Sequence, residues 1–355
     1  MSAVFEPLTL RGLTLPNRLW VSPMCQYSAT DGLPDDWHLV HLGARAVGGA
    51  GLVVTEATAV NAEGRITPGD TGLYDDEQER RWTRIVGFLH EQGAAVGIQI
   101  AHAGRKASTA APWEGGGDVR PEDGGWTTLA PSPVAFPGLR EPRAMTTADL
   151  TRTVEDFAAT AERAHRAGFD VAEVHAAHGY LLHEFLSPLA NHRTDAYGGD
   201  RDARMRYPLE VVEAVRSVWP AEKPLFVRVS ASDWVEGGWT VDDTVAFARA
   251  LAPLGVDLVD CSSGGAVPGA RIELRPGYQV PFAQRVRAEA GLPTAAVGLL
   301  TDPHQVEQVV ADGSADAVFL ARELLRDPNF PLRAAHALGV DVAWPVQYQR
   351  ARWAA

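Results

Sequence analysis

Two histidines and a tyrosine lie within six residues of this sequence, at His175, His178 and Tyr180. They follow a short apolar run, 169–174, which is typical of a β-strand that ends where the histidines begin. Imidazole groups can hold an oxygen atom that gains negative charge, and a phenol can deliver a proton. These groups suit a site that polarises a carbonyl-like acceptor and then protonates a carbon atom. The alternative is a surface loop that happens to be rich in His and Tyr.

Other kinds of chemistry fit these residues less well. His175 and His178 have the i, i+3 spacing of a metal-ligand pair on a helix, but only His183 and Glu184 stand near enough to add a third ligand. The sequence has no Gly-x-Ser-x-Gly motif, which marks the nucleophile of many hydrolases. Its two cysteines are too few for a disulfide framework or a thiolate-ligated cluster. We therefore predict neither a bound metal nor a hydrolytic triad.

Length and charge limit the class of protein and its partners. With 355 residues, the chain is long enough for two ordinary domains or for one α/β barrel. Its net charge of −13, from 32 basic and 45 acidic residues, argues against nucleic acids and anionic membranes as partners. No apolar run approaches the ~20 residues of a membrane span, and the first residues lack the charged and apolar regions of a signal peptide. We expect a cytoplasmic protein.

A short β-rich run followed by a longer amphipathic helix recurs along the whole chain. Helical patterns end in glycine before an apolar strand at Gly93, Gly168, Gly255 and Gly313, which is typical of parallel strands joined by crossover helices. We predict eight strands, at 19–24, 51–57, 95–101, 171–175, 225–230, 258–262, 294–297 and 317–321. Helices are predicted between them at 37–48, 76–92, 147–167, 203–218, 242–254, 281–290 and 304–311.

Eight strands that alternate with helices favour a (β/α)8 barrel over a doubly wound sheet. No Gly-x-Gly-x-x-Gly turn follows the first strand, as a dinucleotide-binding sheet would require. No linker divides the chain, so we predict a single α/β TIM-barrel domain over residues 1–355. The Gly- and Pro-rich segment 112–142 is predicted to be a long irregular loop after strand three, over the active-site face. The aromatic tail, 341–355, is expected to dock on the protein or on another subunit.

Polar residues cluster where the predicted strands end, which is where barrel enzymes place their sites. Strand five carries Arg228, which we expect to be buried and to face an anionic or carbonyl-rich partner, unless it forms a structural ion pair. The glycine after strand seven and Arg322 after strand eight are typical of the phosphate site of this architecture. Two arginines near one ligand indicate that the ligand is anionic.

Several motifs at these strand ends resemble the old yellow enzyme family of flavoproteins. They are Ser-Pro-Met-Cys-Gln-Tyr (22–27), His-Ala-Gly-Arg-Lys (102–106), His-Ala-Ala-His-Gly-Tyr-Leu-Leu (175–182) and Arg-Glu-Leu-Leu-Arg-Asp-Pro (322–328), and the run 185–199 is equally typical. The similarity extends from residue 5 to residue 353. The Cys25/Tyr27 pair and the second histidine, where yeast-type members have Asn, resemble the thermophilic-like bacterial ene-reductase subclass.

The resemblance implies a non-covalently bound FMN over the barrel mouth. Arg228 would lie near the N1 and C2 carbonyl region of the flavin, where a positive charge stabilises the reduced form. Ala321, at a position where the family usually has Gly, would hold the phosphate together with Arg322 and the backbone at Gly298. The implied cofactor-binding residues are Ser22, Pro23, Met24, Cys25, Ala57, Gln99, Arg228, Gly298, Ala321 and Arg322.

The resemblance also implies two half-reactions. NADPH or NADH passes a hydride to the flavin and leaves, and a small activated alkene (an enone, enal, maleimide or nitroalkene) then binds in its place. His175 and His178 would hold the activating oxygen, and Tyr180 would protonate the α-carbon while hydride reaches the β-carbon. Tyr27 would be a second phenol on the substrate side.

Four further residues have less certain roles in this comparison. Cys25 either tunes the flavin potential or fills space as a small apolar residue, and Cys261 is expected in the core. Lys106 faces either the ligand or the solvent. The role of His102 is open.

The C-terminal tail adds a possible contact between subunits. In the subclass, an arginine from the tail reaches a neighbour's active site, so the resemblance implies a homodimer or a homotetramer. Arg350 matches that arginine by its distance from Tyr348, and Arg352 matches it by its distance from Trp353. The alternative is that both are solvated charges.

Other functions stay open at this point. Within the flavin barrels, the alternative is another NAD(P)H dehydrogenase or xenobiotic reductase activity. A barrel that binds flavin without turnover is the alternative outside enzymes. A flavin-free aldolase or isomerase would require a Schiff-base lysine or a carboxylate pair, and we find neither pattern.

Overall fold

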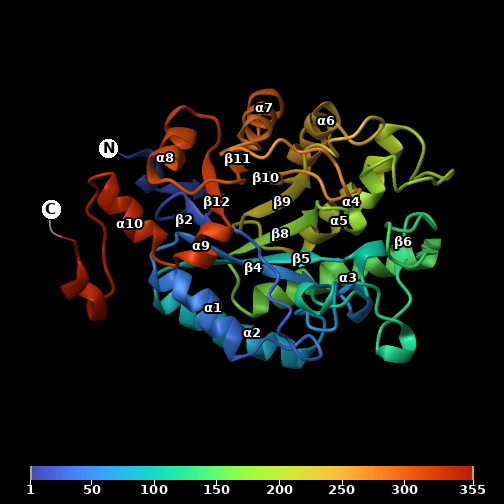
Figure 1. The fold of residues 1–355 in the computed structure, drawn as a ribbon, viewed down its shortest axis with the longest axis horizontal. Helices are drawn as coiled ribbons and strands as arrows, with labels where there is room; N and C mark the ends of the chain where they lie inside the picture. Colours follow the sequence, from blue (N-terminus) through green and yellow to red (C-terminus); the bar gives the residue numbers. More distant parts are fainter. Residues whose placement is uncertain (1, 354–355) are drawn as a thin grey trace.

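The eight predicted apolar runs form the strands of a closed parallel barrel (Figure 1) in the computed structural model, which describes residues 2–353. Each strand turns one face to the lumen and packs the other under helices, so both faces are buried and the runs are apolar. The last strand pairs with the first, which closes the sheet. In chain order the barrel strands are β3 (Leu19–Val21), β4 (Leu52–Ala59), β5 (Ala95–Ala101), β8 (Val171–Ala176), β9 (Leu225–Ser230), β10 (Leu258–Ser262), β11 (Thr294–Ala296) and β12 (Ala317–Leu320).

Helices surround the barrel and connect most successive strands (Figure 1). Those of eight or more residues are α1 (Asp36–Val47), α2 (Asp76–Glu91), α3 (Thr147–Arg166), α5 (Arg201–Val218), α6 (Val241–Leu251), α7 (Val280–Ala290), α8 (Pro303–Ala311) and α10 (Phe330–Ala337). Asp35, Thr146 and Thr240 each cap a helix through reciprocal side-chain and backbone hydrogen bonds, which explains where α1, α3 and α6 begin. Among the described residues, no helix has the length and apolar character that a membrane crossing requires.

The predicted (β/α)8 barrel is confirmed, and the predicted strand and helix ends lie within three residues of the observed ones. Some short elements were not predicted. The hairpin of β1 (Leu8–Leu10) and β2 (Leu13–Leu15) packs Leu10 and Leu15 against Trp20 at the N-terminal end of the lumen. The helices α4 (Leu181–Leu186) and α9 (Arg322–Arg326) have six and five residues, too few to show a helical period in the sequence.

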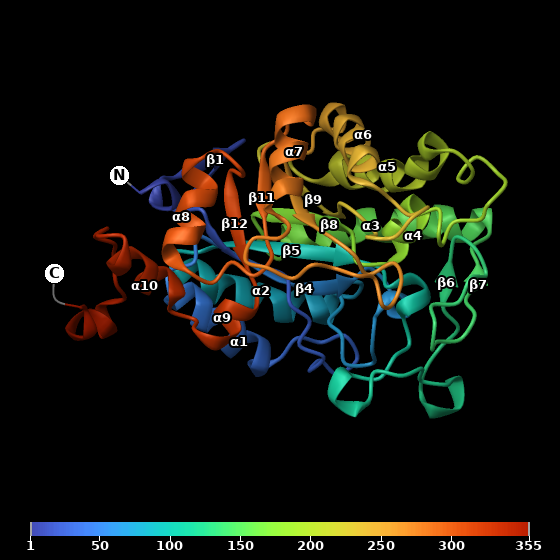
Figure 2. The ribbon, with the colours of Figure 1, turned by 45° about the horizontal axis from the view of Figure 1, so that its top comes forward.

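The segment 112–142 was predicted to be irregular, and this is only partly right. β6 (Leu129–Ala130) pairs with β7 (Arg143–Ala144), and Figure 2 shows this small sheet at one end of the molecule. Arg140 also forms an ion pair with Asp118 (Nε to Oδ2, 2.6 Å), which ties the segment to itself. The Gly and Pro residues of the segment predicted turns and loops, so the short pairing of β6 with β7 was not recognised in the sequence.

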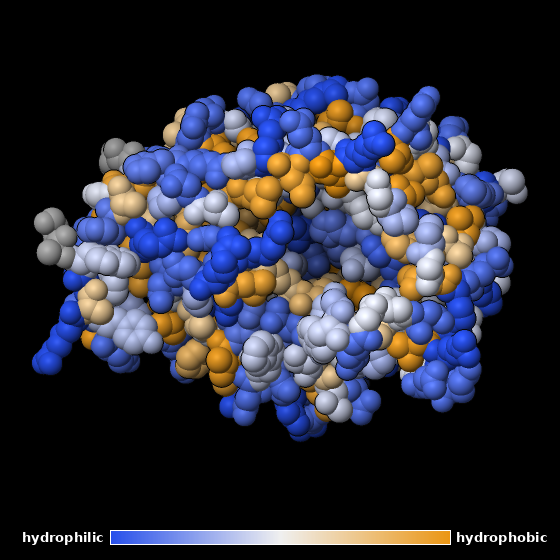
Figure 3. All heavy atoms as spheres, in the orientation of Figure 1, coloured by the Kyte–Doolittle hydropathy of each residue, from blue (hydrophilic) through white to orange (hydrophobic). Residues whose placement is uncertain are grey.

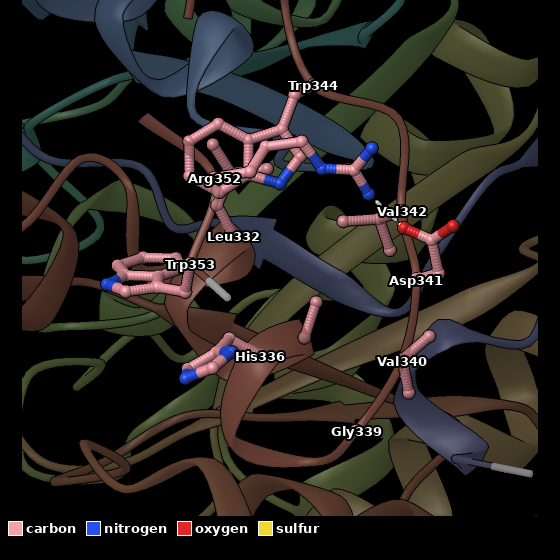
Figure 4. Close-up of a pocket in the computed structure, with 10 residues that line it drawn as sticks. Leu332, His336, Gly339, Val340, Asp341, Val342, Trp344, Arg352 and Trp353 are labelled. Atoms are coloured by element: carbon pink, nitrogen blue, oxygen red, sulfur yellow. Dashed lines mark hydrogen bonds and ion pairs between the residues drawn. The ribbon is translucent and has the colours of Figure 1, made fainter. Parts of the chain in front are cut away.

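The tail folds back against α10 of its own chain. The indole of Trp353 stacks on the His336 imidazole with ring centres 5.1 Å apart, and Trp344 contacts Trp353 edge-on. Figure 4 shows the cleft of about 670 Å³ that remains between the tail and α10, and the ion pair between Arg352 and Asp341 at its side. The tail therefore docks as expected, at the end of the molecule opposite β6 (Figure 1).

Aromatic side chains fill the N-terminal part of the barrel lumen. Trp20 on β3 is completely buried, stacks on Phe226 (ring centres 5.9 Å apart) and meets Phe319 edge-on (5.4 Å). Its indole N–H donates to the Asn17 carbonyl oxygen (2.9 Å), so the polar atom is satisfied. This packed floor supports the polar residues above it.

We expect Trp20→Ala to lower the free energy of unfolding by about 3–5 kcal/mol, because it leaves a cavity in the lumen. Trp113→Ala is the control, since that side chain is 67% exposed in the segment 112–142. Urea unfolding followed by tryptophan fluorescence and circular dichroism measures both. Equal free energies of unfolding for the two variants would show that the aromatic packing around Trp20 does not stabilise the barrel.

Candidate active site

The histidine pair lies at the C-terminal end of β8, where the chain makes a tight turn. Along β8, alternate side chains face the lumen, and His175 is the last of them. His178 and Gly179 then adopt left-handed backbone conformations, with φ of +60° and +73°. The imidazole centres are 5.2 Å apart, and the Tyr180 ring is 5.3 Å from that of His175. The structure thus brings the three sequence-predicted groups together.

The turn after β8 packs directly on the turn after β10. A Cβ atom on Gly179 would lie 2.1 Å from the Gly265 carbonyl oxygen, and one on Gly265 would lie 2.5 Å from the His178 backbone. Ser230 links the two turns, because its hydroxyl accepts from the His178 N–H and donates to the Gly264 carbonyl, each at 2.8 Å. Only glycine permits this approach.

Both histidines are neutral at ordinary pH. Burial and the nearby Arg228 guanidinium lower the pKa of His175 and of His178 well below the usual value for imidazole. The Nε2 atom of His178 lies 2.7 Å from the Ser262 hydroxyl, whereas Nδ1 of His175 is buried and has no hydrogen-bond partner among the described residues. A neutral imidazole with an unpartnered nitrogen can hydrogen-bond an oxygen atom of a ligand.

The ammonium group of Lys106 is held by backbone carbonyl oxygens rather than by solvent, and a ligand-facing role for it stays a prediction. Its ammonium group donates to the carbonyl oxygens of His178 (2.7 Å) and Gly265 (3.3 Å), and it lies 4.7 Å from the centre of the Tyr180 ring. Burial lowers the pKa of Lys106 to about 8 and raises that of the Tyr180 phenol well above its usual range. Tyr180 therefore stays protonated at neutral pH, as a proton donor must.

The segment after β3 supplies a second wall of the site. The Ser22 hydroxyl is buried and has no hydrogen-bond partner in the described part of the chain, and Pro23, Met24 and Cys25 are half-buried. Cys25, Tyr27 and Tyr180 pack around one small apolar cluster, which brings the two phenols to the same region. Tyr27 has a φ of +49° and contacts Trp113 edge-on, so the segment 112–142 reaches the mouth of the barrel as predicted.

Four polar side chains form a layer across the lumen beneath the histidines. The Gln99 amide donates to Glu173 Oε1 (2.7 Å), and the Arg228 Nε lies 3.0 Å from Asp260 Oδ2. Ala57 stands beside Gln99 in the strand register, after an irregularity in β4. Glu173 and Asp260 were missed in the sequence, although each is a charged residue inside an apolar strand, the same signal that marked Arg228.

The predicted phosphate residues line a common pocket of about 220 Å³ at the ends of β10, β11 and β12. Gly298, Ala321 and Arg322 all contribute to its wall. Gly298 has a φ of +123°, and a Cβ atom there would lie 2.8 Å from the Gln279 side chain. The exposed Arg322 side chain forms no hydrogen bond or ion pair within residues 2–353, so its charge is available to an anionic group.

The remaining candidates lie apart from the histidines. Cys261 is buried in the main core, as expected. His102 is buried at the end of β5, where its Nδ1 accepts from the Gly104 N–H (3.1 Å), and burial lowers its pKa to about 3. Arg350 is exposed and Arg352 pairs with Asp341, so neither arginine reaches the site of its own chain.

Comparison with known proteins adds a second line of evidence. A model of the NADH:flavin oxidoreductase / NADH oxidase family matches residues 3–340. An NADPH dehydrogenase of Geobacillus thermodenitrificans is 50% identical, over 98% of both chains. Morphinone reductase in complex with tetrahydroNAD has a similar structure (TM-score 0.78, 29% identity, 96% of this chain and 92% of that chain). An old yellow enzyme homologue from Zymomonas mobilis shares the fold (TM-score 0.80, 23% identity, 99% of both chains).

We expect Gly179→Ala to be more damaging than Gly199→Ala. Both substitutions place a side chain at positive φ, which costs about 1–3 kcal/mol. Only the Gly179 variant also forces a Cβ atom onto the Gly265 backbone, because nothing lies within 4 Å of the Cβ position at Gly199. Thermal unfolding of the two variants measures the difference. Equal melting temperatures would contradict the proposed close contact between the two turns.

Proposed function

The chain belongs to the NADH:flavin oxidoreductase / NADH oxidase family, and we propose that within this family it is an ene-reductase that reduces activated alkenes. The predicted resemblance to the old yellow enzyme family is confirmed by the family match and by the structural neighbours. The chain is therefore an oxidoreductase of the NADPH dehydrogenase type, which acts on small molecules with FMN as cofactor and a nicotinamide as hydride donor.

The residues around the barrel mouth fit FMN. Figure 3 shows a hollow near the centre of the molecule, where hydrophilic side chains gather. The unpartnered Ser22 hydroxyl and the half-satisfied Arg228 guanidinium offer polar contacts for an isoalloxazine ring. The pocket around Gly298, Ala321 and Arg322 would hold the phosphate. We propose that Pro23, Met24, Cys25, Ala57 and Gln99 complete the flavin contacts, with Cys25 tuning the potential.

The observation that carries the proposal is the cluster of two neutral imidazoles and one protonated phenol at the end of β8. When bound, FMN supplies hydride to the β-carbon of the alkene after accepting it from NADPH or NADH. His175 and His178 hydrogen-bond the activating oxygen and stabilise the negative charge that develops on it. Tyr180 then donates its phenolic proton to the α-carbon. Tyr27 contacts the substrate from the segment after β3.

We also propose a homodimer or homotetramer in which the tail of one subunit supplies Arg350 or Arg352 to the site of another. One observation supports it: Arg350 is exposed at the surface of its own chain, where a second subunit can reach it. A cytoplasmic location stays a prediction.

The function is tested first by spectroscopy. We expect the purified protein to be yellow, to bleach when NADPH is added without oxygen, and to regain its absorbance when 2-cyclohexenone or maleimide follows. Steady, alkene-dependent oxidation of NADPH distinguishes an ene-reductase from a flavin-binding barrel without turnover. A protein that stays colourless after incubation with FMN would overturn the proposal.

Tyr180→Phe separates the two half-reactions. Loss of a general acid slows proton transfer by about 10²–10⁴-fold, so reoxidation by the alkene should fall by that order while reduction by NADPH is largely retained. Tyr197→Phe is the control, because that phenol lies outside the barrel and donates to Glu210 (3.1 Å). Stopped-flow absorbance measures both half-reactions. Equal losses in the two would contradict the assignment of Tyr180 as proton donor.

A further inference from the structure

Two fully buried carboxyl groups, Glu173 and Asp260, lie in the lumen beneath the catalytic histidines. Their strands are separated only by β9, which carries Arg228. Arg228 stands beside Asp260 in the register of β9 with β10, and beside His175 in the register of β9 with β8. Among the described residues, Arg228 is the cation that lowers the pKa of both acids. Two acids therefore share one arginine.

Each acid contacts one polar side chain of the layer that is expected to bind the flavin: Glu173 contacts Gln99, and Asp260 contacts Arg228. Glu173 Oε1 accepts from the Gln99 amide (2.7 Å), which directs the amide oxygen away from the acid. Asp260 Oδ2 lies 3.0 Å from the Arg228 Nε, on the inner side of the guanidinium group. Within residues 2–353 the Arg228 guanidinium has this ion pair with Asp260 but no hydrogen bond, and its Nε is buried without one, so the group keeps donors for a ligand.

The charges of this layer balance only if the two acids differ in protonation. Burial raises the pKa of both acids and Arg228 offsets part of that rise in each, but the pKa of Glu173 is raised further by the negative charge of Asp260. A buried ion is stable only when it is paired, and Arg228 lies in direct contact with Asp260 alone. The consistent state is an ionised Asp260 paired with Arg228 and a neutral Glu173.

We propose that Glu173 and Asp260 are positioning residues of the flavin site, with distinct tasks. Asp260 is the ionised counter-ion of Arg228 and offsets part of the positive charge that the arginine presents to the flavin. Glu173 is a neutral acid that orients the Gln99 amide through its carbonyl oxygen. This inference rests on the placement of FMN under the proposed function, but it does not depend on which alkene is reduced.

The midpoint potential of the bound FMN tests the two tasks with isosteric variants. Added electrons on the flavin are stabilised by positive charge, so Asp260→Asn should raise the potential by exposing the full charge of Arg228. Glu173→Gln replaces one neutral group with another and should leave the potential unchanged. Asp257→Asn is the matched control: it removes the ion pair with Arg11 (2.6 Å) at the other end of β10 and should also leave the potential unchanged.

Two results would overturn the proposal: an unchanged potential in Asp260→Asn, or equal shifts in Asp260→Asn and Glu173→Gln. A second measurement covers the case in which Asp260→Asn does not fold. Infrared spectroscopy of the wild-type protein should show a protonated carboxylic acid whose carbonyl band is lost in Glu173→Gln, with or without FMN. Retention of every such band in a folded Glu173→Gln would contradict a neutral Glu173. Failure to bind FMN at all would instead count against the proposed function.

Discussion

The contact between the turns after β8 and β10 is the constraint on which the site depends. Gly179 and Gly265 bring two backbones closer together than any side chain would permit. This approach forces His178 into a left-handed conformation and directs its imidazole to the Ser262 hydroxyl. Lys106 then satisfies carbonyl oxygens from both turns and places its charge over the Tyr180 ring. The positions of the His178 and Tyr180 side chains, for which we propose catalytic roles, follow from this one backbone contact.

The barrel positions the polar residues of the lumen, because side chains along each strand alternate between inward and outward directions. Along each strand, residues two apart share the lumen, so Glu173 lies one step below His175 and Asp260 one step below Ser262. The lumen is thus stratified, with an aromatic floor around Trp20, a polar layer around Arg228 and the histidines above. The apolar packing around Trp20 supports the charged layer from the N-terminal side of the lumen.

The sequence predicted the barrel well because strand and helix signals are local. Apolar runs, C-terminal glycines and helix caps are each contained within a few residues, and the predicted site residues stand at the ends of the apolar runs. The hairpin of β1 and β2 was missed because its two short strands stand outside the alternation of strands and helices that revealed the others. Glu173 and Asp260 were passed over because each is hidden in an apolar run, and their significance depends on partners from other strands. The role of Lys106 depends on the close approach of three separate loops.

The central proposal divides the task between two kinds of group: we propose that the histidines hold the acceptor oxygen and that Tyr180 protonates the α-carbon. Reduction of 2-cyclohexenone by NADPH in D2O tests this most directly, with the position of deuterium in the product determined by mass spectrometry and NMR. A control with cyclohexanone in D2O corrects for enolisation. The account predicts that solvent deuterium enters at the α-carbon, and that this step slows in Tyr180→Phe. An α-carbon that stays unlabelled, or that receives the hydride of the nicotinamide, would contradict it.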